Sequence, residues 1–326
     1  MNKIKAAWII IDDIPGNANQ AIAVAKAMNV NYQVKTIKYN FFSFLPNWLK
    51  FNTLLGIDWS LSSNLDQPYP DLIISSGRKT ALVSAYIKKR DPKIFNVHLM
   101  NPDMCFSSFD MICLPYHDKS SSYDKYNNIH YSIGAPCYLD QNKLKESAEI
   151  FQKQIGNFKR PFVCLMIGGK TKFGNYSLDE LKNLVLKAQD LVTKNDGSLL
   201  ISTSRRTDPS FNKKLIEDLK VPYFFFDWHK DNIENNPYLA YLSLSDYFII
   251  TGDSVSTCSE ALTTGKPTYI YYKNEILSKK HRNFLANLLQ LGYIRYLDKG
   301  TLTLETWNYN ALEEAEKICS IINEKI

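Results

Sequence analysis

Short apolar runs alternate with longer amphipathic segments along this 326-residue chain, and this alternation constrains the fold more than any other feature. Brief, uninterrupted apolar runs are typical of strands buried on both faces of a parallel sheet, with crossover helices between them. The predicted strands cover Ala7–Ile11, Tyr32–Ile37, Asp71–Ser75, Phe95–Leu99, Met111–Leu114, Asn128–Ser132, Phe162–Ile167, Ser198–Thr203, Tyr223–Phe226, Tyr247–Thr251 and Tyr269–Tyr272. The predicted helices cover Asn19–Met28, Thr80–Lys88, Gln141–Gln154, Leu178–Thr193, Ser210–Leu219, Pro237–Ser243, Lys280–Leu291 and Leu312–Asn323. The sequence therefore predicts an α/β protein.

One polar stretch, residues 156–161, interrupts the alternation and ends in Pro161. The pattern restarts directly after it, which favours two Rossmann-like, doubly wound parallel-sheet domains with a cleft between them, as in the GT-B architecture. We expect residues 1–156 to form the N-terminal domain and residues 157–326 to form the C-terminal domain. In a transferase of this architecture, the N-terminal domain would be on the side of the acceptor of the transferred group, and the C-terminal domain on the side of its donor. The last helix could pack back on the first domain. A single TIM barrel would also alternate strands and helices, but the restart argues against it.

The composition argues against several classes of protein. Hydrophobic residues make up 45% of the chain, enough for well-developed cores, but no apolar run approaches the ~18 residues of a membrane-spanning helix. The net charge of +6 is spread along the chain, so it does not indicate nucleic-acid binding, although it suits an anionic substrate or an anionic membrane surface. The six cysteines form no CxxC pair and share no ligand spacing with the five histidines. We therefore expect a cytoplasmic protein with reduced thiols and no metal or other cofactor.

The stretch from Ile249 to Thr268 carries the strongest functional pattern. It predicts a buried strand, a small-residue loop that turns at Gly252, a short helix, and a Gly-Lys-Pro turn into another strand. Free N–H groups at the start of such a helix suit an anion such as a diphosphate, and a carboxylate two turns later, Glu260, could accept hydrogen bonds from ribose hydroxyls. The residues assigned here to a nucleoside and its sugar are Asp253, Ser254, Ser256, Ser259 and Glu260.

Two more loops of the second half follow predicted strands, where the ligands of open parallel sheets bind. The loop after Phe162–Ile167 has two glycines, which we expect to expose backbone N–H groups, and two lysines that add positive charge. The loop after Ser198–Thr203 carries two arginines, whose guanidinium groups match phosphate geometry. The residues expected to hold a diphosphate are Gly168, Gly169, Lys170, Ser204, Arg205, Arg206 and Thr207.

The first half has polar loops in equivalent places, although helix capping alone would also explain them. The loop after Ala7–Ile11 offers amide groups, and the loop after Asp71–Ser75 combines small residues with two cations at a helix start, which suits an anion or a sugar. The binding residues expected here are Gly16, Asn17, Asn19, Gln20, Ser76, Gly77, Arg78 and Lys79. The candidates for a catalytic base are Asp13, His98 and His117.

The stretch from Phe41 to Phe51 is strongly aromatic and is flanked by Lys38 and Lys50. Such a segment can enter a membrane interface beside basic residues, which would place the protein peripherally on the inner membrane face. It could instead be an insertion packed between the second and third strands. The two interpretations differ in whether the phenylalanines and Trp48 are exposed.

Several of these segments together resemble the mitochondrial fission Elm family of plants and bacteria. The resemblance rests on Asp253–Ser256, Ser259–Ala261 and Gly265–Pro267, and on residues 16–20, 75–80, 167–170, 203–207 and 236–238. It implies a GT-B-like fold, and transferases of this fold usually need no bound metal because loop amides and cations stabilise the leaving diphosphate. The family often has histidine where this chain has Asn17, and a bulky apolar residue where it has Thr257.

These observations favour a metal-independent, GT-B-like glycosyltransferase that uses a nucleotide-sugar donor and could act on a lipid-linked acceptor at the inner membrane face. One alternative is a non-catalytic peripheral adaptor on the same scaffold, because the plant relatives are associated with recruiting fission machinery. The other alternative is a nucleotide-sugar epimerase, which needs an acid and a base placed over one sugar carbon. The sequence shows no convincing pair of that kind.

Overall fold

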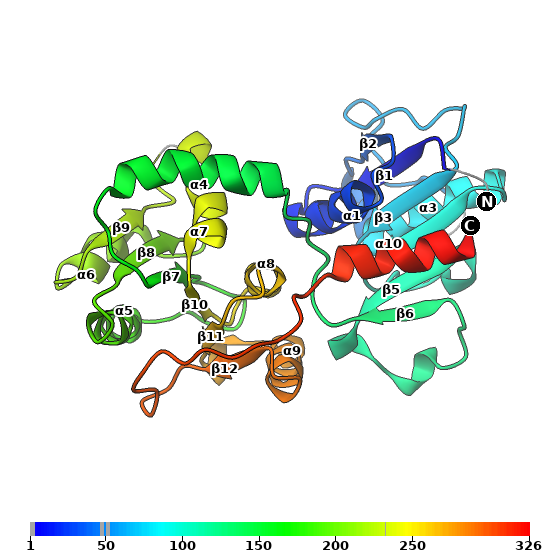
Figure 1. Cartoon of the computed structure of the whole chain (residues 1–326). Coiled ribbons are helices and arrows are strands. Elements are labelled where there is room, and N and C mark those ends of the chain that lie inside the picture. Colours follow the sequence, from blue (N-terminus) through cyan, green and yellow to red (C-terminus); the bar gives the residue numbers. More distant parts are fainter. Residues whose placement is uncertain (1–3, 46–48, 50–52, 232) are drawn as a thin grey trace. The chain divides into compact units, whose positions relative to one another are not determined.

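The computed structural model describes residues 4–45, 49, 53–231 and 233–326. The chain forms two compact units: unit 1 contains residues 1–138 and 313–326, and unit 2 contains residues 139–312. Each unit is built on a six-stranded sheet whose strand pairs are all parallel, with helices packed against it (Figure 1). The predicted α/β class with two doubly wound parallel sheets is confirmed.

The sheet of unit 1 has the strand order β2-β1-β3-β4-β5-β6. The central strand β1 pairs with β2 on one side and β3 on the other, so that Ile9 lies between Val34 and Ile74. The strands are β1 (Ala7–Ile11), β2 (Tyr32–Thr36), β3 (Leu72–Ser76), β4 (Phe95–Leu99), β5 (Met111–Pro115) and β6 (Ile129–Ser132). Because all pairs are parallel, the carboxyl ends of these strands lie at one edge of the sheet.

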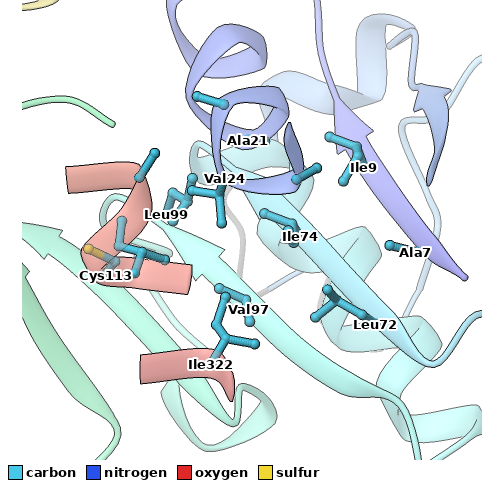
Figure 2. Close-up of a cluster of buried hydrophobic side chains, with 14 of the residues drawn as sticks. Ala7, Ile9, Ala21, Val24, Leu72, Ile74, Val97, Leu99, Cys113 and Ile322 are labelled. Atoms are coloured by element: carbon cyan, nitrogen blue, oxygen red, sulfur yellow. The ribbon is translucent and has the colours of Figure 1, made fainter. Parts of the chain in front are cut away.

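Two helices from opposite ends of the chain cover one face of this sheet. The α-helices of unit 1 whose bounds the structure describes are α1 (Pro15–Ala27), α3 (Arg78–Arg90) and α10 (Glu314–Lys325). Figure 2 shows Ala21 and Val24 of α1 and Ile322 of α10 against Ile74 and Val97 of the sheet, and all five side chains are buried. Burying an aliphatic side chain of this size contributes about 1.5–3 kcal/mol, so α10 is fixed to unit 1 by its own apolar stripe.

The other face of this sheet packs against α3. Trp8, Ile10 and Ile73 form a second buried cluster with Val83 and Ile87 of that helix. Strands β1 and β3 are therefore buried on both faces, which explains why β1 is apolar at every position and why Leu72, Ile73 and Ile74 of β3 are apolar without alternation.

The sheet of unit 2 has the order β12-β11-β10-β7-β8-β9, with β7 between β10 and β8. Its strands are β7 (Phe162–Ile167), β8 (Ser198–Thr203), β9 (Tyr223–Phe226), β10 (Tyr247–Thr251), β11 (Thr268–Tyr271) and β12 (Ile294–Tyr296). Its helices are α4 (Gln141–Ile155), α5 (Leu178–Thr193), α6 (Asn212–Ile216), α7 (Tyr238–Leu244), α8 (Val255–Thr263) and α9 (Lys279–Gln290). Local sequence sets their starts: α5 begins at a capping box in which Ser177 and Glu180 satisfy each other's backbone N–H groups.

The two units meet along the chain at residues 138 and 139, earlier than the boundary expected near residue 156. Helix α4 accounts for the difference because it packs against α7, and the ring of Phe151 lies 5.3 Å from that of Tyr241. Residues 156–161 are therefore a connection inside unit 2. They lead from α4 into β7.

Two elements of unit 2 differ from the sequence-based expectation. The helix expected over residues 210–219 is a 3₁₀ turn, Pro209–Phe211, followed by the short α6. Strand β12 was not predicted, because it has only three residues and only Ile294 among them is buried. Among the described residues, no helix is both long enough and apolar enough to cross a bilayer.

Candidate functional site

The glycine loop after β7 does not offer its backbone N–H groups to a ligand. The N–H of Gly168 donates to Thr251 Oγ1 at 2.7 Å, and that of Gly169 donates to Asp253 Oδ2 at 3.3 Å. The N–H of Lys170 donates to the carbonyl oxygen of Arg206 at 2.9 Å. The expectation that these glycines expose N–H groups to an anion is therefore wrong for this conformation, although the side chain of Lys170 is exposed.

The glycines are needed for close packing instead. A β-carbon on Gly168 would lie 2.2 Å from both carboxylate oxygens of Asp253, and one on Gly169 would lie 2.0 Å from the carbonyl oxygen of Arg206. Either contact is far shorter than van der Waals distance. The missing side chains let the loops after β7, β8 and β10 pack directly on one another.

An ion pair joins two of these loops. The guanidinium of Arg206, after β8, lies 2.7 Å from Asp253 Oδ2, after β10. The arginine side chain is 39% exposed, whereas the aspartate side chain is 0% exposed and its other oxygen, Oδ1, has no hydrogen-bond partner. Arg205 is exposed beside the pair. The structure thus brings together the two loops that the sequence assigned to a diphosphate and a sugar.

The loop after β8 is closed by Thr207. The hydroxyl of Thr207 donates to the carbonyl oxygen of Gly168 at 2.8 Å and accepts from the N–H of Ser204 at 2.9 Å. Thr207 is buried, so its role here is to hold the arginine loop against the glycine loop. Ser204 also uses its hydroxyl inside the turn, where it accepts the N–H of Arg206 at 3.2 Å.

Helix α8 begins at Val255, two residues after Asp253 of the ion pair. Ser254 caps it by accepting the N–H of Thr257 at 3.3 Å, and the two side-chain hydroxyls lie 2.9 Å apart. Ser259 is turned into its own helix, where its hydroxyl donates to the carbonyl oxygen of Val255 at 2.8 Å, and it is not placed to meet a ligand. Ser256, in the first turn, is half-buried and remains a binding candidate.

Glu260 lies on α8, partly buried, and accepts a hydrogen bond from the hydroxyl of Tyr238 in α7. Burial raises the pKa of Glu260, and the hydrogen bond from Tyr238 partly offsets this effect. Only Oε2 is used in the bond. Within the described part of the chain, the second oxygen has no such bond.

In unit 1, the loop after β1 buries Asp12 rather than Asp13. Asp12 Oδ1 accepts the N–H of Ile14 at 3.0 Å, and the side chain is 7% exposed. Burial raises the pKa of Asp12, while the bond from Ile14 and the Lys79 ammonium lower it. Asp13 is exposed and forms an ion pair with Lys38.

Helix α1 starts at Pro15, so the residues expected in a ligand-binding loop lie in its first turns. The side-chain amide of Asn17 lies 2.3 Å from the place of a β-carbon on Gly77, whose φ of +92° favours glycine. Gln20 donates to the carbonyl oxygen of Gly16 at 3.2 Å, and Asn19 is exposed. Of this group, Asn17 is the one held against the loop after β3.

The loop after β3 leads into α3. Ser76 is buried, and its hydroxyl has no hydrogen-bond partner. Arg78 is exposed, whereas the ammonium of Lys79 lies 4.8 Å from the ring of Tyr39 and 5.6 Å from that of Phe44. Lys79 therefore connects this polar loop to the aromatic segment that follows β2.

The two histidine candidates lie in different environments. His98, in β4, is 0% exposed, and its Nδ1 lies 2.8 Å from the hydroxyl of Ser75. Burial lowers the pKa of His98 to about 3, so it stays neutral and does not suit proton exchange with a substrate. His117 is half-buried in a 3₁₀ turn, Tyr116–Asp118, after β5.

Comparison with known proteins identifies the family. The sequence matches the family described as mitochondrial fission ELM1 over residues 15–326, which is nearly the whole chain. The chain belongs to the mitochondrial fission ELM1 family. It is 32% identical to the uncharacterized protein RP120 of Rickettsia prowazekii (strain Madrid E), over 97% of both chains. It is 24% identical to mitochondrial fission protein ELM1 of Arabidopsis thaliana, over 79% of this chain and only 64% of the plant protein's length.

Solved structures place this ELM1-family chain among the GT-B-like folds. The UDP-GlcNAc 2-epimerase of Methanocaldococcus jannaschii, solved with UDP-GlcNAc and UDP, matches with a TM-score of 0.52 and 13% identity, over 98% of this chain and 99% of that one. A UDP-glucosyltransferase of Polygonum tinctorium matches with a TM-score of 0.52 and 10% identity, over 99% and 90% of the two chains. At these identities the likeness is one of fold, and the expected GT-B-like architecture is confirmed.

Two residues that no sequence motif singled out, His281 and Tyr176, lie close enough to the Arg206–Asp253 pair of this family member for its charges to affect their pKa values. His281 lies in the first turn of α9, and burial lowers its pKa, while Asp253 raises that pKa and Arg206 lowers it. Tyr176, just before α5, is buried with its hydroxyl unpartnered, and burial and Asp253 raise its pKa. His281 follows β11, so the rule that ligands bind beyond carboxyl ends of strands could have found it.

Proposed function

We propose that this ELM1-family protein is a GT-B-like glycosyltransferase whose unit 2 binds a nucleotide-sugar donor. The observation that carries the proposal is Glu260, a partly buried carboxylate that Tyr238 holds by one oxygen, on the helix that starts behind the Arg206–Asp253 pair. Burial of a carboxylate is costly, and its raised pKa records that cost. A ribose hydroxyl that donates a hydrogen bond to the second oxygen would explain why a carboxylate is buried at this position.

The phosphates of the donor would bind to side chains rather than to the glycine loop. Arg205 and Arg206 both follow β8, and a guanidinium can donate two parallel hydrogen bonds to a phosphate. The first turn of α8 adds the positive end of the helix dipole and its backbone N–H groups other than that of Thr257, which is bonded to Ser254. The chemistry then requires positive charge to stabilise the leaving diphosphate, which these groups supply.

The aromatic segment of unit 1 supports a lipid-linked acceptor at the inner membrane face. Phe41, Phe42 and Phe44 are 81%, 51% and 80% exposed, which suits contact with a membrane interface, whereas Ser43 between them is buried, as a packed insertion would require. Lys79 lies against the ring of Phe44 and adds positive charge beside it. Trp48 lies outside the described residues.

Calorimetric titration with nucleoside diphosphates and nucleotide sugars tests the donor site. We expect the wild-type protein to bind at least one of them below millimolar concentration, and Glu260→Ala to bind it more weakly. A second assay would then follow release of the nucleoside diphosphate from the bound sugar nucleotide, with and without added membrane lipid. A protein that binds the nucleotide sugar without ever releasing the diphosphate would contradict the transferase activity but not the donor site.

The second candidate function is a non-catalytic peripheral adaptor on the same scaffold. The hydrogen bonds of the glycine loop favour this adaptor function, because all three N–H groups from Gly168 to Lys170 are bonded inside the protein. The Arabidopsis relative is named a mitochondrial fission protein, which fits a recruiting role. Failure of every nucleotide to bind, together with retained binding to vesicles, would favour the adaptor.

A further inference from the structure

The carboxylate of Asp253 occupies groups of unit 2 that would otherwise bind an anion. It accepts the N–H of Gly169 at 3.3 Å and pairs with the guanidinium of Arg206 at 2.7 Å. The same guanidinium donates to the backbone carbonyl of Asp253 at 3.4 Å. An incoming phosphate that binds Arg206 must therefore compete with a carboxylate of the protein itself.

The competition is costly because Asp253 cannot turn to solvent. Its side chain is 0% exposed, and a buried carboxylate that loses its cationic partner is strongly destabilised. Arg206, at 39% exposed, can leave the pair far more easily than Asp253 can. A ligand that attracts Arg206 binds well only if it also compensates Asp253.

One buried oxygen of this pair has no hydrogen-bond partner among the described residues. It is Asp253 Oδ1, which can only accept. A hydroxyl group of a ligand can donate to a carboxylate, so it could supply the hydrogen bond that Asp253 lacks.

We propose that Asp253 makes this site select diphosphates that carry a sugar over bare diphosphates. A sugar hydroxyl would replace Arg206 as the donor to Asp253, while Arg206 moves to the phosphate. A bare diphosphate offers no such hydroxyl beside the phosphate that binds Arg206. Its binding is therefore weakened by the full free-energy cost of opening the Arg206–Asp253 ion pair. This inference rests on the proposed donor site and names what its ligand must contain.

The test is calorimetric titration of inorganic pyrophosphate, UDP and UDP-glucose into wild type and Asp253→Asn. Asparagine carries no charge, so Arg206 gives up no ion pair, and Asp253→Asn should bind pyrophosphate and UDP about tenfold or more tightly than wild type does. Wild type should bind UDP-glucose more tightly than UDP. Asp246→Asn is the matched control, because it removes one charge from another Arg–Asp pair of unit 2, with Arg160, and should leave all three affinities unchanged.

The outcomes separate this inference from the proposed function. Equal binding of pyrophosphate and UDP by wild type and Asp253→Asn, or no binding by either, overturns the inference. If a water molecule rather than a sugar hydroxyl donates to Asp253, wild type will show no preference for UDP-glucose over UDP. That result also overturns the inference. If Asp253→Asn gains pyrophosphate binding while no sugar nucleotide binds any variant, the competition by Asp253 is supported and the proposed function fails.

Discussion

The hydroxyl of Tyr238 donates a hydrogen bond to Glu260 and so joins α7 to α8, the helices on either side of β10 in the sequence. The carboxylate is thereby held in a fixed, partly buried place, and burial raises its pKa. A carboxyl group whose pKa is shifted in this way by burial is more typical of a binding or catalytic site than of a stabilising contact.

The first prediction concerns stability and pH. In the folded state the pKa of Glu260 lies above its ordinary value of 4.5, so the folded protein binds more protons than the unfolded chain across that interval. Stability from this group is therefore greatest at low pH and falls as the pH rises from 4.5 through the raised pKa. Glu260→Gln should flatten this fall and be more stable than wild type at pH 7, because glutamine carries no charge to bury. Urea unfolding at several pH values measures it.

A glutamine variant with the same pH slope as wild type would show that Glu260 carries no such cost. Asp12, whose pKa is also raised, contributes a slope of the same sign and is unchanged in this variant. The quantity to compare is therefore the difference in pH slope between wild type and Glu260→Gln, not the slope of either protein alone.

The second prediction concerns the glycine loop. A β-carbon on Gly169 would meet the backbone of Arg206 at 2.0 Å and that of Thr207 at 2.6 Å, and backbone atoms cannot move aside as a flexible side chain can. Gly169→Ala should lower the free energy of unfolding by about 1–3 kcal/mol. Gly16→Ala is the control, since nothing lies within 4 Å of its β-carbon, and it should leave stability unchanged or raise it. Equal stability of the two variants would contradict the packing.

The third prediction concerns the aromatic segment. Replacing Phe41, Phe42 and Phe44 by serine should reduce sedimentation with phosphatidylglycerol vesicles about tenfold or more, because their exposed rings would no longer be buried in lipid. The melting temperature should not fall, because these side chains contribute little to the core. The control replaces Leu289, Leu291 and Leu302, exposed apolar residues of unit 2, and should sediment like wild type. Equal loss in both triple variants would point to general surface hydrophobicity.

The sequence was sufficient for the sheets because their strands are short, mostly apolar runs. Ala7–Ile11 and Phe162–Ile167 are apolar throughout, and they have the expected bounds, as does Phe95–Leu99 although it also buries Asn96 and His98. The boundary between the two units could not be predicted in the same way. The sequence of α4 is compatible with packing on either unit, and only its contact with α7 assigns it to unit 2.

The candidate site was predictable in its loops but not in its contacts. The rule of carboxyl strand ends led to Arg206 and Asp253, yet no sequence pattern says that the two side chains neutralise each other. Likewise, glycines that accommodate a neighbouring carboxylate cannot be told in sequence from glycines that cradle a phosphate. Asp12 was passed over for Asp13 because burial within a pair of adjacent acids depends on where the strand ends.

The measurement that tests the donor site most directly is calorimetric titration of wild type, Glu260→Ala and Arg206→Lys with a panel of nucleoside diphosphates and nucleotide sugars. Hydrogen bonds to a charged group are worth about 1.5–3 kcal/mol, so Glu260→Ala should lose roughly tenfold to hundredfold in affinity. Arg206→Lys should also bind more weakly, because an ammonium cannot reproduce a bidentate guanidinium. Melting temperatures recorded alongside should stay within a few degrees of wild type. If wild type binds none of the panel at millimolar concentration, or if Glu260→Ala binds as tightly as wild type, the donor site is not where we place it.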